Sequence, residues 1–203
     1  LLGHAVLSAA AGEAHLLNLS VAPAGGKGQG MAGPAAGLAI SARGGGAVSA
    51  VVEEARLAIR AMREADLAVV FENEQAAYTH PWTLGILRVF LRVGSQCQVV
   101  EQDGELLGQA VLSAAAGEAH LLNLSVAPVH QHQGIGRRLL RRMLRLAGEK
   151  GADTVFLEVR TSNTHAQYLY QSEGFCEVGR RRAYYPHDDQ GREDAVIYAK
   201  PLF

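Results

Sequence analysis

A long apolar strand, a glycine-containing turn and an amphipathic helix follow one another and limit the folds open to this chain. The strand is "EAHLLNLSVAP" at 118–128, the turn is "VHQHQGIG" at 129–136, and the helix is "RRLLRRMLRLAGEK" at 137–150. The helix carries leucines and a methionine on one side and five arginines on the other. A strand that is apolar along nearly its whole length is typical of the centre of a covered sheet. The arrangement predicts a layered α/β domain built around this strand.

The rest of the sequence predicts further strands and helices on either side of this unit. Two strands flank Asp103-Gly104, a dipeptide typical of tight hairpin turns. In chain order we expect a strand at 56–62, helices at 63–78 and 81–93, strands within 95–115 and at 118–128, a helix at 137–150, a strand at 153–160, a helix at 163–174, and strands at 175–185 and 193–202. This order predicts an α/β fold with a mixed sheet and helices on both faces.

A block of 23 residues occurs twice, at 1–23 and at 106–128, and differs only where His4 replaces Gln109. The first copy is not followed by the arginine-rich helix. Residues 24–51 are rich in Gly, Ala and Ser with few large apolar side chains, a composition typical of a linker. We therefore expect a duplicated strand fragment at 1–23, a Gly/Ala-rich linker at 24–51 and one domain at 52–203, a size that suits a single core.

The charge balance and the two cysteines indicate which binding partners and which cellular compartment to expect. The chain has 19 basic and 20 acidic residues, which gives no support to a nucleic-acid or membrane partner. No apolar run reaches the roughly 18–20 residues of a membrane span. Cys97 and Cys176 lie in apolar strand-like contexts, which indicates buried thiols in a reducing compartment. We expect a cytoplasmic protein, and no metal site, because His130 and His132 have no third ligand at suitable spacing.

The turn at Gln131–Gly136 is a candidate anion site. Glycine lets the backbone approach a ligand closely, and the first amides of a helix have no partner within it. A phosphate or pyrophosphate fits such a site, where the helix dipole and Arg137 add favourable charge. The glycines alone are equally consistent with a tight strand-to-helix turn beside a solvated basic face. A nucleoside triphosphate loop is disfavoured because no Gly-Lys-Ser/Thr follows.

Four blocks carry a family resemblance: "SVAPVHQHQGIGRRLL", "FLEVRTSNTHAQYLYQSEGF", "GRRRAYYP" and "GREDAVIYAKPL". In this order and at this spacing they resemble the GNAT superfamily of acetyl-CoA-dependent N-acetyltransferases. Within it they are similar to the RimI type, the N-terminal alanine acetyltransferases of a small-subunit ribosomal protein. The resemblance covers roughly Arg56 to Phe203. It implies the GNAT acyl-CoA N-acyltransferase fold, acetyl-CoA as co-substrate and a protein N-terminus as acceptor.

The resemblance also implies roles for individual residues. Glu158 matches the general base and Tyr170 the general acid. The positions that match cofactor contacts are Leu124, Ser125, Val126, His132, Gln133, Gly134, Ile135, Gly136, Arg137 and Asn163. Those that match the peptide-binding side are Trp82, Tyr184 and Tyr185. Gln98 departs from the aliphatic or aromatic residue expected in its strand, which puts the local packing there in question.

The two proposed proton-transfer groups suit amide formation from a thioester. An α-amine with a pKa of about 8 is mostly protonated at neutral pH, so a base is needed, and a phenol with a pKa near 10 still holds a proton for the departing thiolate.

The same residues also have structural alternatives: a strand ion pair between Glu158 and Arg160, and a core position for Tyr170. Alternative functions are acetylation of a small amine or lysine, and an acyl-CoA-binding module without turnover. The arginine face as a nucleic-acid patch lacks interleaved aromatics.

We predict that residues before about Val52 are dispensable for catalysis, because all catalytic and cofactor positions lie after Leu106. The first copy has the same side-chain pattern as 106–128, so it can compete for that place in the sheet or pair along an edge. A chain starting near Ala55 should be as active and more monodisperse by size-exclusion chromatography. Loss of cofactor binding or of folding would instead make the fragment an integral part of the domain.

Overall fold

A seven-stranded mixed sheet organises the domain. The structure is a computed structural model that describes residues 57–187 and 191–202. In chain order its elements are β1 (Ala58–Ala61), η1 (Glu64–Asp66), α2 (Leu67–Ala77), α3 (Leu84–Arg92), β2 (Gln96–Gln102), β3 (Glu105–Ala115), β4 (Glu118–Val126), η2 (Pro128–His130), α4 (Ile135–Glu149), β5 (Thr154–Arg160), α5 (Thr164–Ser172), β6 (Cys176–Pro186) and β7 (Arg192–Pro201). The predicted order of elements is confirmed. The predicted fragment at 1–23 and linker at 24–51 lie outside the described residues.

The strand order is β1-β2-β3-β4-β5-β7-β6, so the apolar strand β4 lies at the centre, as predicted. β4 and β5 run parallel, whereas the other adjacent strands of the described sheet run antiparallel. The predicted hairpin at Asp103-Gly104 is also present. Both residues have positive φ, 52° and 85°, as the turns that best match strand twist require.

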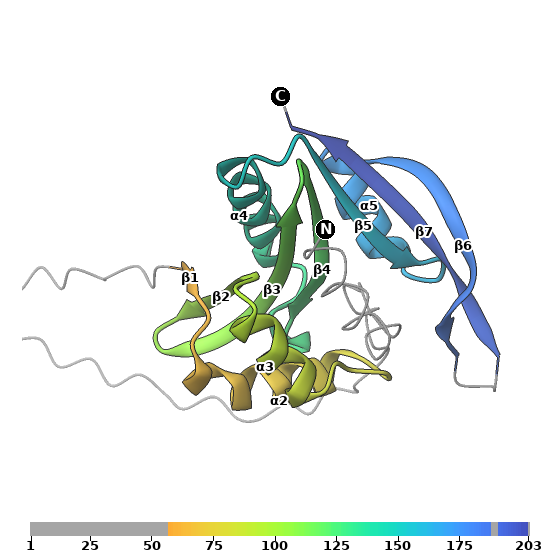
Figure 1. Cartoon of the computed structure of the whole chain (residues 1–203). Helices are drawn as coiled ribbons and strands as arrows, with labels where there is room; N and C mark the ends of the chain where they lie inside the picture. Colours follow the sequence, from red (N-terminus) through yellow and green to blue (C-terminus); the bar gives the residue numbers. More distant parts are fainter. Residues whose placement is uncertain (1–56, 188–190, 203) are drawn as a thin grey trace, which may run out of the picture.

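Helices cover both faces of the sheet, as the sequence predicted (Figure 1). Side chains of neighbouring strand residues point to opposite faces. Val100 and Leu112 join the core cluster under α4 and α5, whereas Val99 and Val111 join the cluster under α2 and α3. The amphipathic helix α4 buries most of its predicted apolar face in the first cluster. The members of that face are Leu139, Leu140, Met143 and Ala147, which are buried, and Leu144, which is partly buried.

The central strands β4 and β5 separate part of the way along their length. They pair only from Glu118–Leu121 to Thr154–Leu157, although β4 continues to Val126 and β5 to Arg160. A β-bulge in β4 lies at the same level, because Leu112 pairs with Leu121 while Val111 pairs with Asn123, which leaves Leu122 extra. Figure 1 shows green β4 and teal β5 together at one end and apart at the other. The sheet is therefore divided into two halves beyond these paired residues, and we call the region of separated strands the opening.

The prediction of two buried thiols holds for Cys97 and is wrong for Cys176. Cys97 is buried, and burial raises the pKa of its thiol to about 12. Cys176 is exposed because it begins β6, the edge strand, most of whose side chains face solvent. Gln98, the unexpected strand residue, is buried and its side-chain amide donates to the Cys97 carbonyl at 3.1 Å.

Within the described ranges, no helix has the length and apolar character to cross a membrane.

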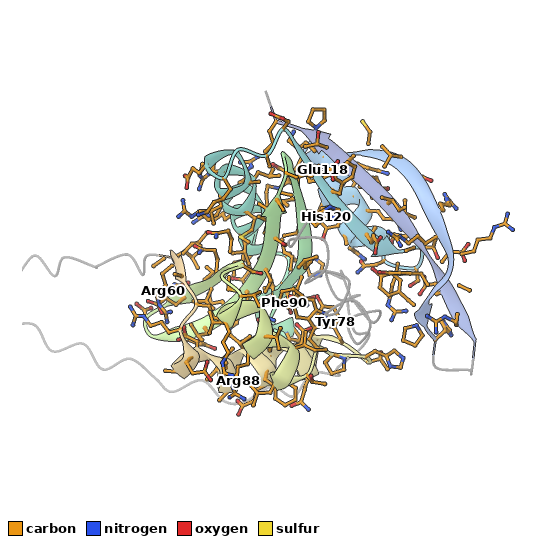
Figure 2. The ribbon with its side chains drawn as sticks, in the orientation of Figure 1. Arg60, Tyr78, Arg88, Phe90, Glu118 and His120 are labelled. Atoms are coloured by element: carbon orange, nitrogen blue, oxygen red, sulfur yellow. The ribbon has the colours of Figure 1, made fainter. Side chains whose placement is uncertain are left out.

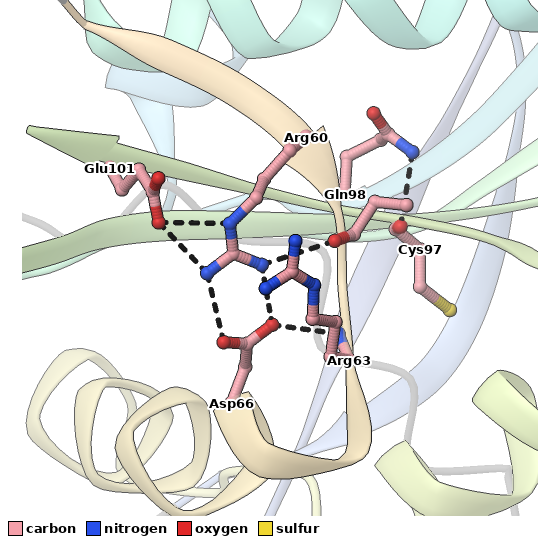
Figure 3. Close-up of polar contacts among 7 residues, drawn as sticks. Arg60, Arg63, Asp66, Cys97, Gln98 and Glu101 are labelled. Atoms are coloured by element: carbon pink, nitrogen blue, oxygen red, sulfur yellow. Dashed lines mark hydrogen bonds and ion pairs between the residues drawn. The ribbon is translucent and has the colours of Figure 1, made fainter. Parts of the chain in front are cut away.

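An ion cluster attaches the start of the helical pair to the edge of the sheet (Figure 3). Arg60 on β1 donates to both carboxylate oxygens of Asp66, at 2.7 and 2.9 Å, and to Glu101 on β2 at 2.9 Å. The Arg63 amide also donates to Asp66, at 2.7 Å. The hydrogen bond from Arg60 is the largest effect that lowers the pKa of Asp66 below its usual value. Ionised Asp66 therefore joins β1 to η1, and Arg60 extends the cluster to Glu101 on β2.

We predict that Asp66→Asn lowers the free energy of unfolding by about 1–3 kcal/mol at pH 7, the range for a hydrogen bond to a charged group. The pKa of Asp66 is lower in the folded state, so its contribution is present above its unfolded pKa of about 3.9 and is lost as pH falls through the folded value. Urea unfolding at pH 7 and again below pH 4 should show the difference from wild type shrinking. A difference that stays constant with pH would contradict this assignment.

The matched control is Glu64→Gln, which removes an exposed carboxylate paired with Arg88 at 2.6 Å. Exposed pairs of this kind contribute about 0–1 kcal/mol. The control should therefore change the free energy of unfolding less than Asp66→Asn does.

Candidate active site

Glu158 lies at the point where β4 and β5 separate. It directly follows Leu157, the last residue of β5 that pairs with β4. Leu157 and Val159 enter the core under α4 and α5, so Glu158 between them points to the opposite face. That face is the one that α2 and α3 cover farther along the sheet. Glu158 therefore borders the opening on the side of these two helices.

Glu158 is held by residues of the edge strand β6. The Nε of Arg181 lies 2.6 Å from a carboxylate oxygen of Glu158, which is only 16% exposed in its side chain. Burial first, and then the neighbouring Glu158, raise the pKa of Tyr184 well above its usual range. The alternative ion pair between Glu158 and Arg160 is not formed. Arg160 instead donates to the Pro186 carbonyl at 2.9 Å and to Glu193 at 3.2 Å.

Tyr170 approaches from the other face of the sheet. It belongs to the core under α4 and α5, is fully buried, and contacts Phe175 and Tyr198 at ring-centroid distances of 5.8 and 6.4 Å. Its hydroxyl has no hydrogen-bond partner among the described residues. Burial raises the pKa of Tyr170 well above its usual range, so the phenol keeps its proton. Tyr168 is 71% exposed, as expected for a residue on another side of α5.

The predicted anion-binding turn has the backbone such a site requires. His132 and Gly134 have positive φ values of 62° and 78°, and α4 begins at Ile135 with no side chain capping its first turn among the described residues. The first backbone bond of the helix runs from the Arg138 amide to Gly134 O at 3.1 Å. The preceding amides are therefore available to an anion. A Cβ on Gly136 would lie 3.7 Å from Val126 on β4, so this turn packs directly against the central strand.

Arg137 is not a free cation beside this turn. It forms an ion pair with Glu173 at the end of α5, and Arg141 binds the same carboxylate at 2.8 and 3.0 Å. The hydrogen bond from Arg141 is the largest effect that lowers the pKa of Glu173. Part of the basic face of α4 therefore attaches α4 to the end of α5 through ion pairs. The sequence allowed either a cation beside an anion site or a solvated basic face, and these arginines match neither fully.

The other predicted cofactor positions lie along the opening. Asn163 caps α5, because its Oδ1 accepts from the Ala166 amide at 3.1 Å, while its buried Nδ2 has no partner among the described residues. Leu124, Ser125 and Val126 form the buried end of β4 beyond the bulge. His132 and Gln133 are exposed on the turn.

The three predicted peptide-side residues occupy different environments. Trp82 is 1% exposed and stacks on Phe90 at 5.0 Å, so it belongs to the core under α2 and α3. Tyr184 is half-buried beside Glu158. Tyr185 is buried, with its ring edge-on to Tyr184 at 5.0 Å and the Arg160 guanidinium 4.5 Å above it. The two tyrosines thus lie on β6, and Tyr184 is the one that interacts with Glu158.

Sequence reasoning missed three residues around the opening: Glu74, Tyr78 and Arg181. Glu74 is fully buried on α2 together with Leu67, Val70 and Ala77. The signal was a carboxylate at the helical spacing of buried apolar residues, an unusual place for a charge. The Tyr78 hydroxyl donates to Leu124 O at 2.9 Å, and Figure 2 shows Tyr78 toward the separated end of the strands and His120 toward the paired end.

The described part of the chain holds no group of three or more His, Cys, Asp or Glu side chains that could bind a metal ion.

Comparison with known families agrees with this fold. The profile of the acetyltransferase (GNAT) family matches residues 56–175. The chain belongs to this family, and the predicted fold is thereby confirmed.

Within the family, the chain is similar to individual proteins that share a more specific name. The chain is 40% identical over 144 residues to the [ribosomal protein bS18]-alanine N-acetyltransferase of Haemophilus ducreyi, covering 70% of this chain and 97% of the relative. It is 37% identical over 147 residues to the Escherichia coli K12 protein of the same name, again covering 97% of the relative. A crystal structure of the Escherichia coli ribosomal-protein-S18-alanine N-acetyltransferase superposes with a TM-score of 0.68 at 36% identity, covering 72% of this chain and 94% of that one.

Proposed function

We propose that this protein is an acetyl-CoA-dependent N-acetyltransferase that acetylates the N-terminal alanine of ribosomal protein bS18. Relatives of that name match it at 37–40% identity over 97% of their own length. The proposal implies a cytoplasmic enzyme whose acceptor is a protein N-terminus. The observation that carries it is the pair of groups at the opening, Glu158 on one face of the sheet and Tyr170 on the other.

Glu158 is proposed as the general base. An α-amine with a pKa of about 8 arrives mostly as the ammonium and must lose a proton before its lone pair can attack the thioester carbonyl. A carboxylate can take that proton directly or through one water. The Arg181 ion pair fixes the orientation of Glu158 at the mouth of the opening. Tyr184, half-buried beside it, supports a place for the acceptor's first residues on this face.

Tyr170 is proposed as the general acid, and the turn before α4 as the anchor of the co-substrate. Collapse of the tetrahedral intermediate breaks the carbon–sulfur bond, and the thiolate that leaves takes a proton. The buried Tyr170 hydroxyl retains its proton and has no competing partner among the described residues. The free amides at Ile135 and Gly136 suit the pyrophosphate, and the unpaired Nδ2 of Asn163 offers one further donor.

Release of CoA thiol from acetyl-CoA, measured against a panel of acceptors, tests the proposal. The panel holds short peptides with the bS18 N-terminus, the same peptides with the first alanine replaced, polyamines and free lysine. We expect the alanine peptide to have the highest kcat/KM. Preference for polyamines or lysine would support a GNAT enzyme for another amine, and binding of acetyl-CoA without release for any acceptor would indicate a non-catalytic acyl-CoA-binding module.

Substitutions at the two proton-transfer groups should separate catalysis from binding. Removing such a group typically costs about a hundred- to ten-thousandfold in rate. We expect Glu158→Gln to lower turnover most at pH values where the amine is still protonated, and Tyr170→Phe to slow thiolate departure. Acetyl-CoA affinity should change little in either variant, because the turn at His132–Arg137 is untouched.

The matched control is Tyr168→Phe, which removes an exposed hydroxyl two residues away on the same helix and should be nearly neutral. Wild-type turnover in both Glu158→Gln and Tyr170→Phe, measured with peptide below saturation, would return both residues to structural roles.

A further inference from the structure

A buried carboxylate on α2 connects four segments around the opening. Glu74 is fully buried, and its oxygens accept hydrogen bonds from three nitrogens. Gln109 Nε2 on β3 lies 2.8 Å away, Asn123 Nδ2 on β4 lies 3.0 Å away, and the Trp82 amide before α3 lies 3.3 Å away. Asn123 belongs to the bulge at which β4 leaves β5. The carboxylate is thus attached to the strand where the opening begins.

The chain contacts β4 a second time directly after the end of α2. Tyr78 follows Ala77, the last residue of the helix, and its backbone is extended. The Tyr78 hydroxyl donates to Leu124 O at 2.9 Å, directly after the Asn123 contact. Close packing behind β4 leaves this segment little freedom, because a Cβ on Gly108 of β3 would lie 2.5 Å from Ser125 O. Glu74 and Tyr78 therefore fix the backbone of 123–125, where β4 no longer pairs with β5.

We propose that Glu74 is a positioning residue that, in its ionised form, holds the bulge of β4 in the conformation that binds acetyl-CoA. The inference rests on the proposed function only in that acetyl-CoA is the ligand. It concerns a residue that contacts neither the reacting atoms nor the turn before α4. Its contacts are with the strand expected to receive the arm of the co-substrate.

The hydrogen bonds favour one protonation state. The three nitrogen donors are N–H groups, which an ionised carboxylate accepts without presenting a proton of its own, and the neighbouring Ser125 hydroxyl on β4 also favours the ionised form. Burial, the largest effect, disfavours the charge and raises the pKa of Glu74 to about 7, against the opposing hydrogen bonds. Tyr78, directly after α2, is a titratable neighbour of Glu74 and in turn interacts with Tyr170 of α5 and Tyr185 of β6. Among the described residues that bond to Glu74, none carries a cationic side chain. Its ionisation is therefore free to change near neutral pH.

The repeated block supplies a natural test of this contact. Gln109, which donates to Glu74, is the one position at which the two copies differ, and the first copy has His4 there. An imidazolium beside Glu74 would stabilise the carboxylate and lower the pKa at which it ionises. Gln109→His therefore changes the charge at this site with a residue that the chain itself carries at the matching position.

The test is the dissociation constant of acetyl-CoA, measured by calorimetry from pH 6 to pH 8.5 for wild type and Glu74→Gln. We expect the variant to bind on the order of tenfold more weakly at pH 8, the effect of about one hydrogen bond, and nearly as tightly as wild type at pH 6, where Glu74 is protonated. Titration of the CoA phosphates is common to both proteins and cancels in the ratio. Glu72→Gln, an exposed carboxylate on the same helix, is the control and should match wild type at every pH.

Two further variants keep the test decisive if Glu74→Gln does not fold. Tyr78→Phe should weaken binding at every pH, because it removes the bond to Leu124 O without removing a charge. Gln109→His should move the pH dependence to lower pH. An affinity ratio that does not vary with pH, or an unshifted profile in Gln109→His, would overturn the inference. Wild-type protein that binds acetyl-CoA yet acetylates no bS18 peptide would overturn only the proposed acceptor, whereas failure to bind acetyl-CoA would overturn both.

Discussion

The separation of β4 from β5 after four paired positions is the feature on which the rest of the site depends. Strands in a sheet normally satisfy each other's backbone groups, and an unpaired buried group costs free energy. Here the bulge at Leu122 directs β4 away, and Tyr78 provides a side-chain hydroxyl for the Leu124 carbonyl. An extended ligand with amide groups can supply the strand-like contacts that β5 no longer makes, which is why an opening in the middle of a sheet can be a binding site.

The two halves of the sheet stay together because one core continues behind the opening. The cluster under α4 and α5 includes Leu121 and Leu124 from β4 and Leu157 and Val159 from β5. Tyr170 is part of the same cluster, so the proposed acid is packed into the core that joins the two halves of the sheet. On the other face, the smaller cluster under α2 and α3 covers β2 to β4 and leaves Glu158 beside β6. The proposed base and the proposed acid thus lie on opposite faces of the sheet.

The sequence predicted the elements well because their signals are local. Alternating apolar residues, Asp103-Gly104 and the two faces of α4 each depend on a few neighbours in the chain. The errors and omissions involve contacts between distant segments. Cys176 is exposed because β6 became an edge strand. Arg181 lies on β6 between two irregularities in its pairing with β7, and its contact with Glu158 on β5 joins residues far apart in the chain. Glu74 looked like one more acidic residue of an ordinary helix, and only the three donors from other segments distinguish it. The residues of the candidate site were predicted from the family resemblance, because the periodicity of the sequence does not identify them.

Amide hydrogen exchange of the full chain, with and without acetyl-CoA, tests the central role of the opening most directly. Exchange is slow where backbone amides are hydrogen-bonded or excluded from water. We expect acetyl-CoA to slow exchange in 122–126 of β4 and in 134–138 at the start of α4, and to leave the hairpin of β6 and β7 largely unchanged. Unchanged exchange in both of the first two segments at saturating acetyl-CoA would contradict the account, because the co-substrate would then bind somewhere other than between β4 and β5.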